Sequence, residues 1–256
     1  MKYLTSLLLG LLIGVVHADH HGNKVAGMDL SKGNALQMQL CSLKPGKKMS
    51  DYEANFDDYI AWSKKHGVET FAMRLTPMFV TPPDNGTSIE WIEILASPFS
   101  VSGEAWDKWL TTEDGQKLNA RWQTLADCRV SVNPVFTLFA DPAITAQDTR
   151  VMTLNWCTRN PGVSSDQVQA RHRSVLAART SDSPISSWSI SYNGLGRRNA
   201  PGDYLHMLSF ADNAALMRYM DGYANNEGWR RRQDYETSYA SCTGQNAYFV
   251  NVLNRP

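Results

Sequence analysis

Three titratable side chains are placed where they could do chemistry. Arg74, Glu93 and His206 each lie between two apolar residues, in runs that alternate as β-strands do. His206 is a candidate general acid or base because the ordinary pKa of histidine is close to neutral. Arg74 would hold an anionic or carbonyl group, with Glu93 beside it. The alternatives are a buried Arg74–Glu93 salt bridge that fixes strand register and a histidine whose partners are purely structural.

Residues 1–18 have the pattern of a secretory signal peptide. Lys2 supplies the positive charge, residues 7–16 supply the apolar run, and small residues precede Asp19. An apolar run of this length is too short to cross a bilayer, which needs about 20 residues. We therefore expect a mature chain that starts at Asp19, has no membrane span and is periplasmic or extracellular.

Cleavage before Asp19 would create a possible metal site at the new N-terminus. The free amine, two backbone amides and the imidazole of the third residue can surround Cu(II) or Ni(II) in square-planar geometry. The residues of this predicted site are Asp19, His20 and His21. A disordered polar terminus is the alternative.

The composition excludes some partners. The 256 residues are 43% hydrophobic and carry 25 basic and 25 acidic side chains. Loss of Lys2 with the signal peptide changes the formal charge from zero to −1. This balance gives no electrostatic basis for binding nucleic acid or an anionic membrane.

The cysteines indicate disulfides. An even number of cysteines in an exported chain favours pairing, and four of them allow three arrangements. They are Cys41, Cys128, Cys157 and Cys242. Pairing all four would leave no thiol free to act as a nucleophile.

The sequence reads as two copies of one unit. Similar segments follow one another in the same order and at nearly the same offset in both halves. They are Cys41–Gly46 and Cys157–Gly162, Trp91–Leu95 and Tyr204–Leu208, and Asp127-Cys128 and Ser241-Cys242. We therefore expect a signal peptide (1–18), a flexible N-terminal segment (19–35), a first α+β repeat (36–140), a linker (141–150) and a second α+β repeat (151–256).

Each copy has the element order strand, helix, strand, strand, helix, strand, which is that of the ferredoxin-like βαββαβ unit. In that topology strand one lies antiparallel beside strand four. Cys41 ends the first strand of its copy and Cys128 precedes the last, and Cys157 and Cys242 occupy the same places in the second copy. The predicted disulfides are Cys41–Cys128 and Cys157–Cys242.

Two such units, each with a second helix interrupted near Glu113 or Glu227, resemble the dimeric α+β barrel superfamily. That superfamily includes antibiotic-biosynthesis-type monooxygenases and stress-responsive barrel proteins. The resemblance implies two antiparallel sheets that pack into one intramolecular α+β barrel, so the chain would be a monomeric pseudo-dimer. It also implies a small-molecule ligand held between the sheets.

Strand alternation then predicts which residues line that space. The aliphatic side chains of each strand suit the amphipathic helices, so we expect the opposite, polar set to face the barrel interior. A lining this polar would be costly in a dry core. Its predicted members are Gln37, Gln39, Arg74, Trp91, Glu93, Thr137, Thr153, Asn155, Ser187, Ser189, Ser191, Tyr204, His206 and Asn251.

The function predicted from these features is an exported protein that binds a small organic molecule. As an enzyme it would carry out cofactor-independent oxygenation or acid–base chemistry, with His206, Arg74 and Glu93 as catalytic residues. Its ligand would contact Gln39, Trp91, Asn155, Ser189, Tyr204 and Asn251. No cofactor is required, and the alternatives are a non-catalytic binding or structural protein and a haem or copper protein.

Overall fold

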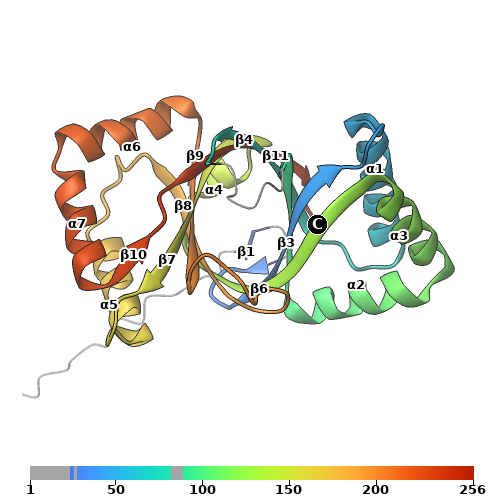
Figure 1. Ribbon diagram of the computed structural model, residues 1–256, viewed down its shortest axis with the longest axis horizontal. Coiled ribbons are helices and arrows are strands. Elements are labelled where there is room, and N and C mark those ends of the chain that lie inside the picture. The colour runs from blue at the N-terminus through green and yellow to red at the C-terminus, as the bar shows by residue number, and fades with distance from the viewer. Residues whose placement is uncertain (1–23, 26–27, 82–88) are drawn as a thin grey trace, which may run out of the picture.

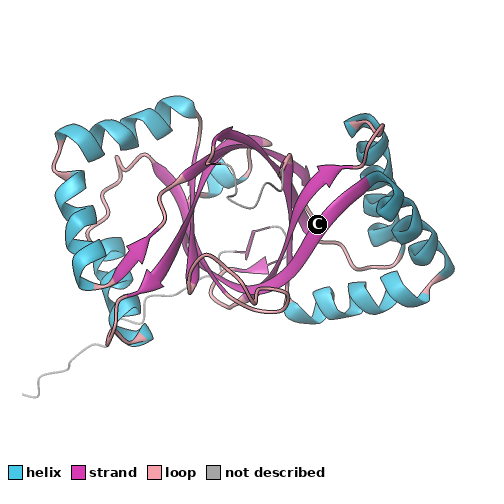
Figure 2. Ribbon diagram, viewed as in Figure 1, coloured by secondary structure: helices cyan, strands magenta, loops and turns pink. Residues whose placement is uncertain are grey.

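A computed structural model of the chain describes residues 24–25, 28–81 and 89–256. A β-barrel lies at the centre, with one group of helices against each of two opposite sides (Figures 1 and 2). The first group is α1 to α3 and the second is α5 to α7. The predicted signal peptide, residues 1–18, lies outside the described residues.

The first unit contains four strands and three helices. They are β3 (Asn34–Leu43), α1 (Met49–Lys65), β4 (Phe71–Phe79), β5 (Trp91–Ser97), α2 (Phe99–Thr111), α3 (Glu113–Leu125) and β6 (Ala126–Ala140). Before it, β1 (Lys24–Val25) and β2 (Met28–Asp29) pair as a small antiparallel sheet. After it, the short helix α4 (Pro142–Thr145) leads into the second unit.

The second unit repeats this order, with its last strand divided. Its elements are β7 (Thr149–Arg159), α5 (Ser165–Ala177), β8 (Ile185–Tyr192), β9 (Tyr204–Phe210), α6 (Asn213–Asn225), α7 (Gly228–Ser238), β10 (Ala240–Cys242) and β11 (Asn246–Asn254). The predicted interruption of the second helix is present in both units. α2 gives way to α3 at Thr112, and α6 gives way to α7 between Asn225 and Gly228.

The strand order closes the barrel. Within the first unit β6 pairs with β3, β3 with β5, and β5 with β4, all antiparallel. The second unit has the equivalent order β11, β7, β9, β8. Two antiparallel pairings, β4 with β11 and β6 with β8, join the units. Two ferredoxin-like sheets thus form one intramolecular eight-stranded barrel, and the predicted fold class is confirmed.

The barrel interior is apolar along most of its strands. One buried cluster contains residues from seven of the eight barrel strands and none from a helix, so it fills the interior. It includes Met38, Ile94 and Met207. The aliphatic residues between which Arg74, Glu93 and His206 lie therefore face inward.

The prediction that the polar set faces the interior is wrong for most of its members. They lie on the outer face of the sheet, under the helices, where the other buried clusters combine strand and helix residues. The misplaced residues are Gln37, Gln39, Arg74, Trp91, Glu93, Thr153, Asn155, Tyr204, His206 and Asn251. Thr137, Ser187, Ser189 and Ser191 do lie on the interior face, where Thr137 Oγ1 and Ser189 Oγ are 3.0 Å apart.

Side-chain caps fix where several helices begin. The Ser164 hydroxyl accepts a hydrogen bond from Gln167 N, and the Gln167 side chain accepts one from Ser164 N. The Thr112 hydroxyl accepts from Gly115 N and so starts α3 directly after α2. The first cap fixes the start of α5, and the second fixes the point at which the first unit's interrupted helix changes from α2 to α3.

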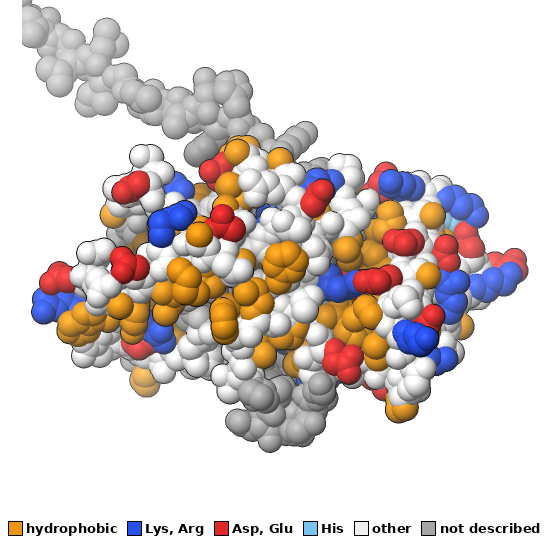
Figure 3. All heavy atoms as spheres, turned by 90° about the horizontal axis from the view of Figure 1, so that it is seen from above, with side chains coloured by type: hydrophobic (Ala, Val, Ile, Leu, Met, Phe, Trp, Pro, Cys, Tyr) orange, Lys and Arg blue, Asp and Glu red, His pale blue; other side chains and the backbone are white. Residues whose placement is uncertain are grey.

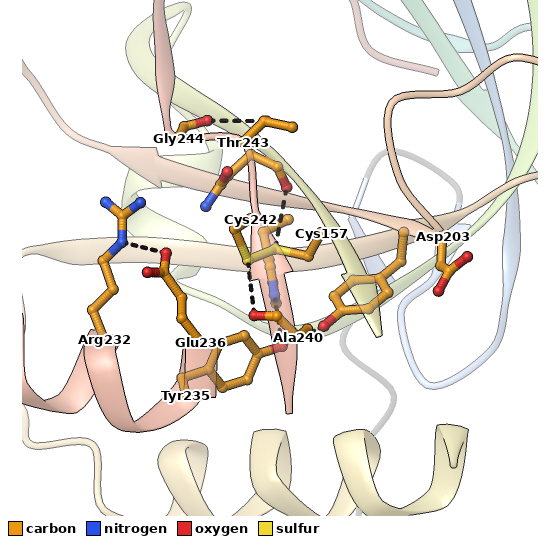
Figure 4. Close-up of a disulfide and its surroundings, with 12 residues drawn as sticks. Cys157, Asp203, Arg232, Tyr235, Glu236, Ala240, Cys242, Thr243 and Gly244 are labelled. Carbon is orange, nitrogen blue, oxygen red and sulfur yellow. Dashed lines mark hydrogen bonds and ion pairs between the residues drawn. A yellow bond between two sulfur atoms is a disulfide. The ribbon is translucent and has the colours of Figure 1, made fainter. Parts of the chain in front are cut away.

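Both predicted disulfides are present. Cys41 lies directly opposite Cys128 in the β3–β6 pairing, and Cys157 lies opposite Cys242 in the β7–β10 pairing. Figure 4 shows the second disulfide at the end of the sheet, near Tyr235 of α7. Each bond closes most of one unit, since its cysteines are 87 or 85 residues apart.

Among the described residues, no helix is both long and apolar enough to cross a membrane.

Candidate functional site

A pocket opens on the helix side of the first unit. Its floor is the outer face of β3 and β5, and its walls are α1, α2 and α3. The cavity volume is about 80 Å³. It is lined by Gln37, Gln39, Tyr52, Asn55, Phe56, Tyr59, Trp62, Thr70, Leu95, Ser97, Ser102, Ala105, Trp106, Trp109, Trp122 and Val130.

Seven of the lining side chains are aromatic, and all seven come from the helices. Tyr59, Trp62 and Trp109 form a compact group with ring centroids 5.2–5.9 Å apart. Tyr59 and Trp62 lie one turn apart on α1, whereas Trp109 reaches them from α2. The packing of these two helices against each other therefore builds one wall of the pocket.

Two of the tryptophans place an indole nitrogen, a hydrogen-bond donor, in this aromatic lining. Trp106 Nε1 donates a hydrogen bond to Gln37 Oε1 at 2.9 Å. Trp62 is 4% exposed, and its Nε1 has no hydrogen-bond partner among the described residues. Burial of an unpaired donor is costly, so a ligand or water that accepts from Trp62 Nε1 would stabilise the pocket.

A charged network is buried next to the pocket. Glu93 is completely buried, and its Oε2 accepts hydrogen bonds from Trp91 Nε1 at 3.1 Å and from Arg74 Nε at 3.3 Å. Arg74 Nη1 donates to Glu53 Oε1 of α1 at 2.8 Å. Glu93 is paired across the sheet with Gln39, which lines the pocket floor. The network is thus one side chain away from the cavity.

Burial raises the pKa of Glu93 to about 7, and the neighbouring Arg74 opposes this rise. The carboxyl group can therefore gain or lose a proton near neutral pH. Its Oε1 has no partner among the described residues. This combination fits a group that exchanges a proton, and it also fits a buried ion pair that fixes strand register.

In the second unit, the positions that correspond to Trp91 and Glu93 belong to a packed aromatic cluster. Tyr235 of α7 is at its centre, with its Oη 2.8 Å from His172 Nε2, 2.5 Å from Tyr204 Oη and 3.4 Å from His206 Nε2. Trp188 Nε1 donates to His206 Nδ1 at 3.0 Å. Both ring nitrogens of His206 thus have polar neighbours inside a packed aromatic cluster.

Burial lowers the pKa of His206 to about 3 and that of His172 to about 4. His172 adds to the effect on His206. Both imidazoles are neutral at pH 7, and His206 does not line the pocket described above. The geometry thus favours a structural role for His206 over the predicted acid–base role.

The remaining predicted ligand contacts are dispersed. Asn155 is paired across the sheet with His206 in the second unit. Asn251 of β11 is paired with Arg74 on the helix side. Ser189 lies inside the barrel next to Thr137. The structure brings together Gln39, Arg74, Trp91 and Glu93, with Asn251 beside Arg74, but it does not place Asn155 or Ser189 with them.

The aromatic walls were not predicted. Tyr52, Phe56 and Tyr59 fit an ordinary core-facing helix stripe, and nothing in that stripe reveals a cavity. The available signal was composition, since five of the eight tryptophans occur in the first unit. Trp106 and Trp109, one turn apart, place two of them on one face of a helix.

Cofactors fit this site poorly. A cavity of about 80 Å³ is far smaller than a haem, and no histidine, cysteine or methionine is among its lining residues. The described residues contain no group of three or more His, Cys, Asp or Glu side chains that could hold a metal ion. The predicted copper ligands Asp19, His20 and His21 lie outside the described residues.

Comparisons with known proteins support the fold. No family model matches the sequence, and no curated protein is significantly similar to it. A candidate monooxygenase of Fusobacterium nucleatum aligns over 87% of this chain and 93% of its own, with 12% identity and a TM-score of 0.54. A candidate monooxygenase of Lactobacillus acidophilus aligns over 87% and 100%, with 12% identity and a TM-score of 0.53. A candidate chlorite dismutase aligns over 88% and 96%, with 10% identity and a TM-score of 0.51.

These similarities define the class of protein. The chain has the fold of the dimeric α+β barrel proteins, with both units in one polypeptide. At 10–12% identity the likeness extends to the fold alone. The chemistry must therefore be argued from the pocket and its neighbouring carboxyl group.

Proposed function

We propose that this chain is an exported protein that binds a small organic molecule in the helix-side pocket of its first unit. The observation that carries the proposal is the difference between the two units. The first has a cavity lined by seven aromatic rings beside Glu93, whereas in the second Tyr235 packs against Tyr204 and His206, which correspond to Trp91 and Glu93. Apolar concave sites with a few placed polar groups are the usual form of a small-molecule site.

The polar groups at the pocket give the ligand an orientation. Trp62 Nε1 is a buried donor without a described partner, and Gln39 offers both a donor and an acceptor at the floor. A ligand with one acceptor atom would satisfy Trp62. The size of the cavity favours a small molecule, or a small end of a larger one, because an engineered cavity of about 150 Å³ holds a benzene ring.

Acid–base chemistry is the reaction class that Glu93 supports. Its pKa of about 7 suits proton transfer at neutral pH, and its Oε1 lacks a described partner. Gln39 and Tyr52 lie between this carboxyl group and the bound molecule. Glu93 is accordingly our candidate for proton exchange with the ligand by way of the Tyr52 hydroxyl, which passes one proton to the ligand as it takes one from Glu93, and Arg74 positions the carboxyl group.

Export is supported by the N-terminal pattern and by the two disulfides. Exported proteins fold in oxidising compartments, where disulfides form and persist. Each disulfide joins the first strand of a unit to its divided or undivided last strand, β6 in the first unit and the β10 part in the second. We expect the protein to be purified from the periplasm or the medium with both bonds formed.

The binding proposal is tested with small probes and a matched pair of variants. Benzyl alcohol, choline and 3,3-dimethyl-1-butanol are each titrated against the purified protein by isothermal titration calorimetry. At least one should bind, and Gln39→Leu should weaken that binding by about fivefold, the worth of one hydrogen bond. Asn155→Leu is the control, because Asn155 pairs with His206 as Gln39 pairs with Glu93.

Binding that Gln39→Leu and Asn155→Leu weaken equally would place the ligand elsewhere. No binding of any of the three probes would count against the pocket as a site for molecules of this size.

A further inference from the structure

We propose that the first-unit pocket binds a cationic head group, of the alkylated ammonium class, by cation–π interactions. This inference rests on the proposed function and specifies the charge of its ligand. Three features carry it: the number of aromatic rings, the lack of charged residues among the lining side chains, and the acidic surroundings of the pocket.

The lining is suited to a cation. Aromatic faces carry partial negative charge, and groups of them hold quaternary ammonium ions in many proteins. Seven rings line this cavity, four of them tryptophan, which is the strongest cation–π partner. None of the lining residues is lysine or arginine, so no fixed positive charge at the cavity surface would repel such a ligand.

The residues behind the lining are acidic on balance. Arg74 lies between two carboxylates, those of Glu53 and Glu93, so the three side chains carry one surplus negative charge when both are ionised. Tyr52 separates this group from the cavity, and the Arg74 guanidinium stacks on its ring at 5.4 Å. Because Glu93 is fully buried and Glu53 is half exposed, solvent screens this surplus charge only in part.

The helices that cover the pocket also carry more acidic than basic side chains. α1, α2 and α3 contain eight acidic and five basic side chains, whereas α5, α6 and α7 of the second unit contain four acidic and six basic ones. Figure 3 shows charged side chains of both signs gathered at the end of the molecule that α1 to α3 form. The net negative charge of α1, α2 and α3 therefore attracts a cation to the unit that contains the cavity.

The size of the cavity limits its ligand. At about 80 Å³ it is too small for a fused ring system, so the part of a ligand that enters it must be compact, as trimethylammonium is. Because Trp62 Nε1 needs an acceptor, a hydroxyl or carbonyl oxygen near the charged nitrogen of the ligand would complete the site.

The test compares two probes of the same shape. Choline and 3,3-dimethyl-1-butanol differ by one charge, since a quaternary carbon replaces the nitrogen. Calorimetric titration of the full mature protein should give choline a Kd at least about tenfold lower than that of the neutral alcohol. Trp109→Leu should remove most of this preference and Trp109→Phe should keep part of it, because phenylalanine still presents a π face.

Trp229→Leu, on an exposed residue of α7, is the control and should leave both Kd values unchanged. Urea unfolding is measured for each variant, to show that a lost preference for choline does not result from a loss of folded protein. Equal or tighter binding of the neutral alcohol by the folded wild-type protein overturns the cation proposal while the proposed pocket stands. Failure of choline, the alcohol and benzyl alcohol alike overturns both proposals.

Discussion

Glu93→Gln should make the protein more stable at alkaline pH but not at acidic pH. The pKa of Glu93 is about 7 in the folded protein against an ordinary value of 4.5. The unfolded chain therefore releases this proton at lower pH than the folded protein does. Between pH 4.5 and 7 the folded state binds more protons, so stability falls as the pH rises.

The size of this effect follows from the shift. Each pKa unit corresponds to about 1.4 kcal/mol, so ionisation of Glu93 costs the fold about 3 kcal/mol above pH 7. A glutamine at this position stays neutral and avoids that cost. The free energy of unfolding of Glu93→Gln minus that of the wild type should rise by about 3 kcal/mol from pH 4.5 to pH 7 and then level off.

Urea unfolding at closely spaced pH values between 4 and 9 measures this difference, with the disulfides intact. Glu53→Gln is the matched control, because Glu53 binds the other side of Arg74 but is half exposed. The free energy of unfolding of Glu53→Gln minus that of the wild type should not show the rise of about 3 kcal/mol between pH 4.5 and pH 7. A Glu93→Gln difference that is constant with pH would show that burial does not govern this carboxyl group.

Four further predictions concern the second unit, the disulfides and the N-terminus. The pKa of His206 is lowered to about 3, so as the pH falls the unfolded chain binds a proton at this residue before the folded protein does. The free energy of unfolding should therefore decrease as the pH falls from 6.5 towards 3. His206→Gln should reduce this decrease, as measured by acid titration followed by circular dichroism. Because His206 is packed in an aromatic cluster, His206→Ala should lower the free energy of unfolding by about 3 kcal/mol in urea, whereas a change below about 1 kcal/mol would indicate an open site. Replacing Cys41 and Cys128 by serine should cost about 4 kcal/mol by the chain-entropy model, and a loss below about 1 kcal/mol would contradict that estimate. The intact mass of the exported protein should correspond to a start at Asp19, and any other start removes the proposed copper site.

The overall fold was accessible from the sequence because several local signals agreed. The Cys-to-Pro-Gly segments, the interrupted second helices and the strand patterns occur in one order in both halves. That order defined the strand neighbours, and the strand neighbours defined the disulfides. Such agreement between levels is what makes a topology predictable.

Alternation could not decide which face of the sheet points inward. It separates Ile92 and Ile94 from Glu93 with certainty, but both faces of this sheet are buried. The narrow interior is filled by aliphatic side chains, whereas on the outer face the polar set finds hydrogen-bond partners both in neighbouring strands and in the helices. Glu53 of α1 supplies one for Arg74, and Tyr235 of α7 lies beside His206.

The pocket depends on packing between helices, which no single segment encodes. Tyr59 and Trp109 lie far apart in the sequence, and their rings form one wall only once α1 and α2 are in place. In the second unit, Tyr235 of α7 packs instead against His172, Tyr204 and His206. The surroundings of the two sheets therefore differ in a few large side chains that the helices contribute.

Diffraction from crystals pressurised with xenon tests the central claim most directly, because xenon occupies apolar cavities whatever the natural ligand is. We expect a xenon peak between the sheet and α1, α2 and α3, close to Leu95, Trp62 and Trp109. Xenon inside the barrel among Met38, Ile94 and Met207, with none at the helix-side pocket, would contradict the account.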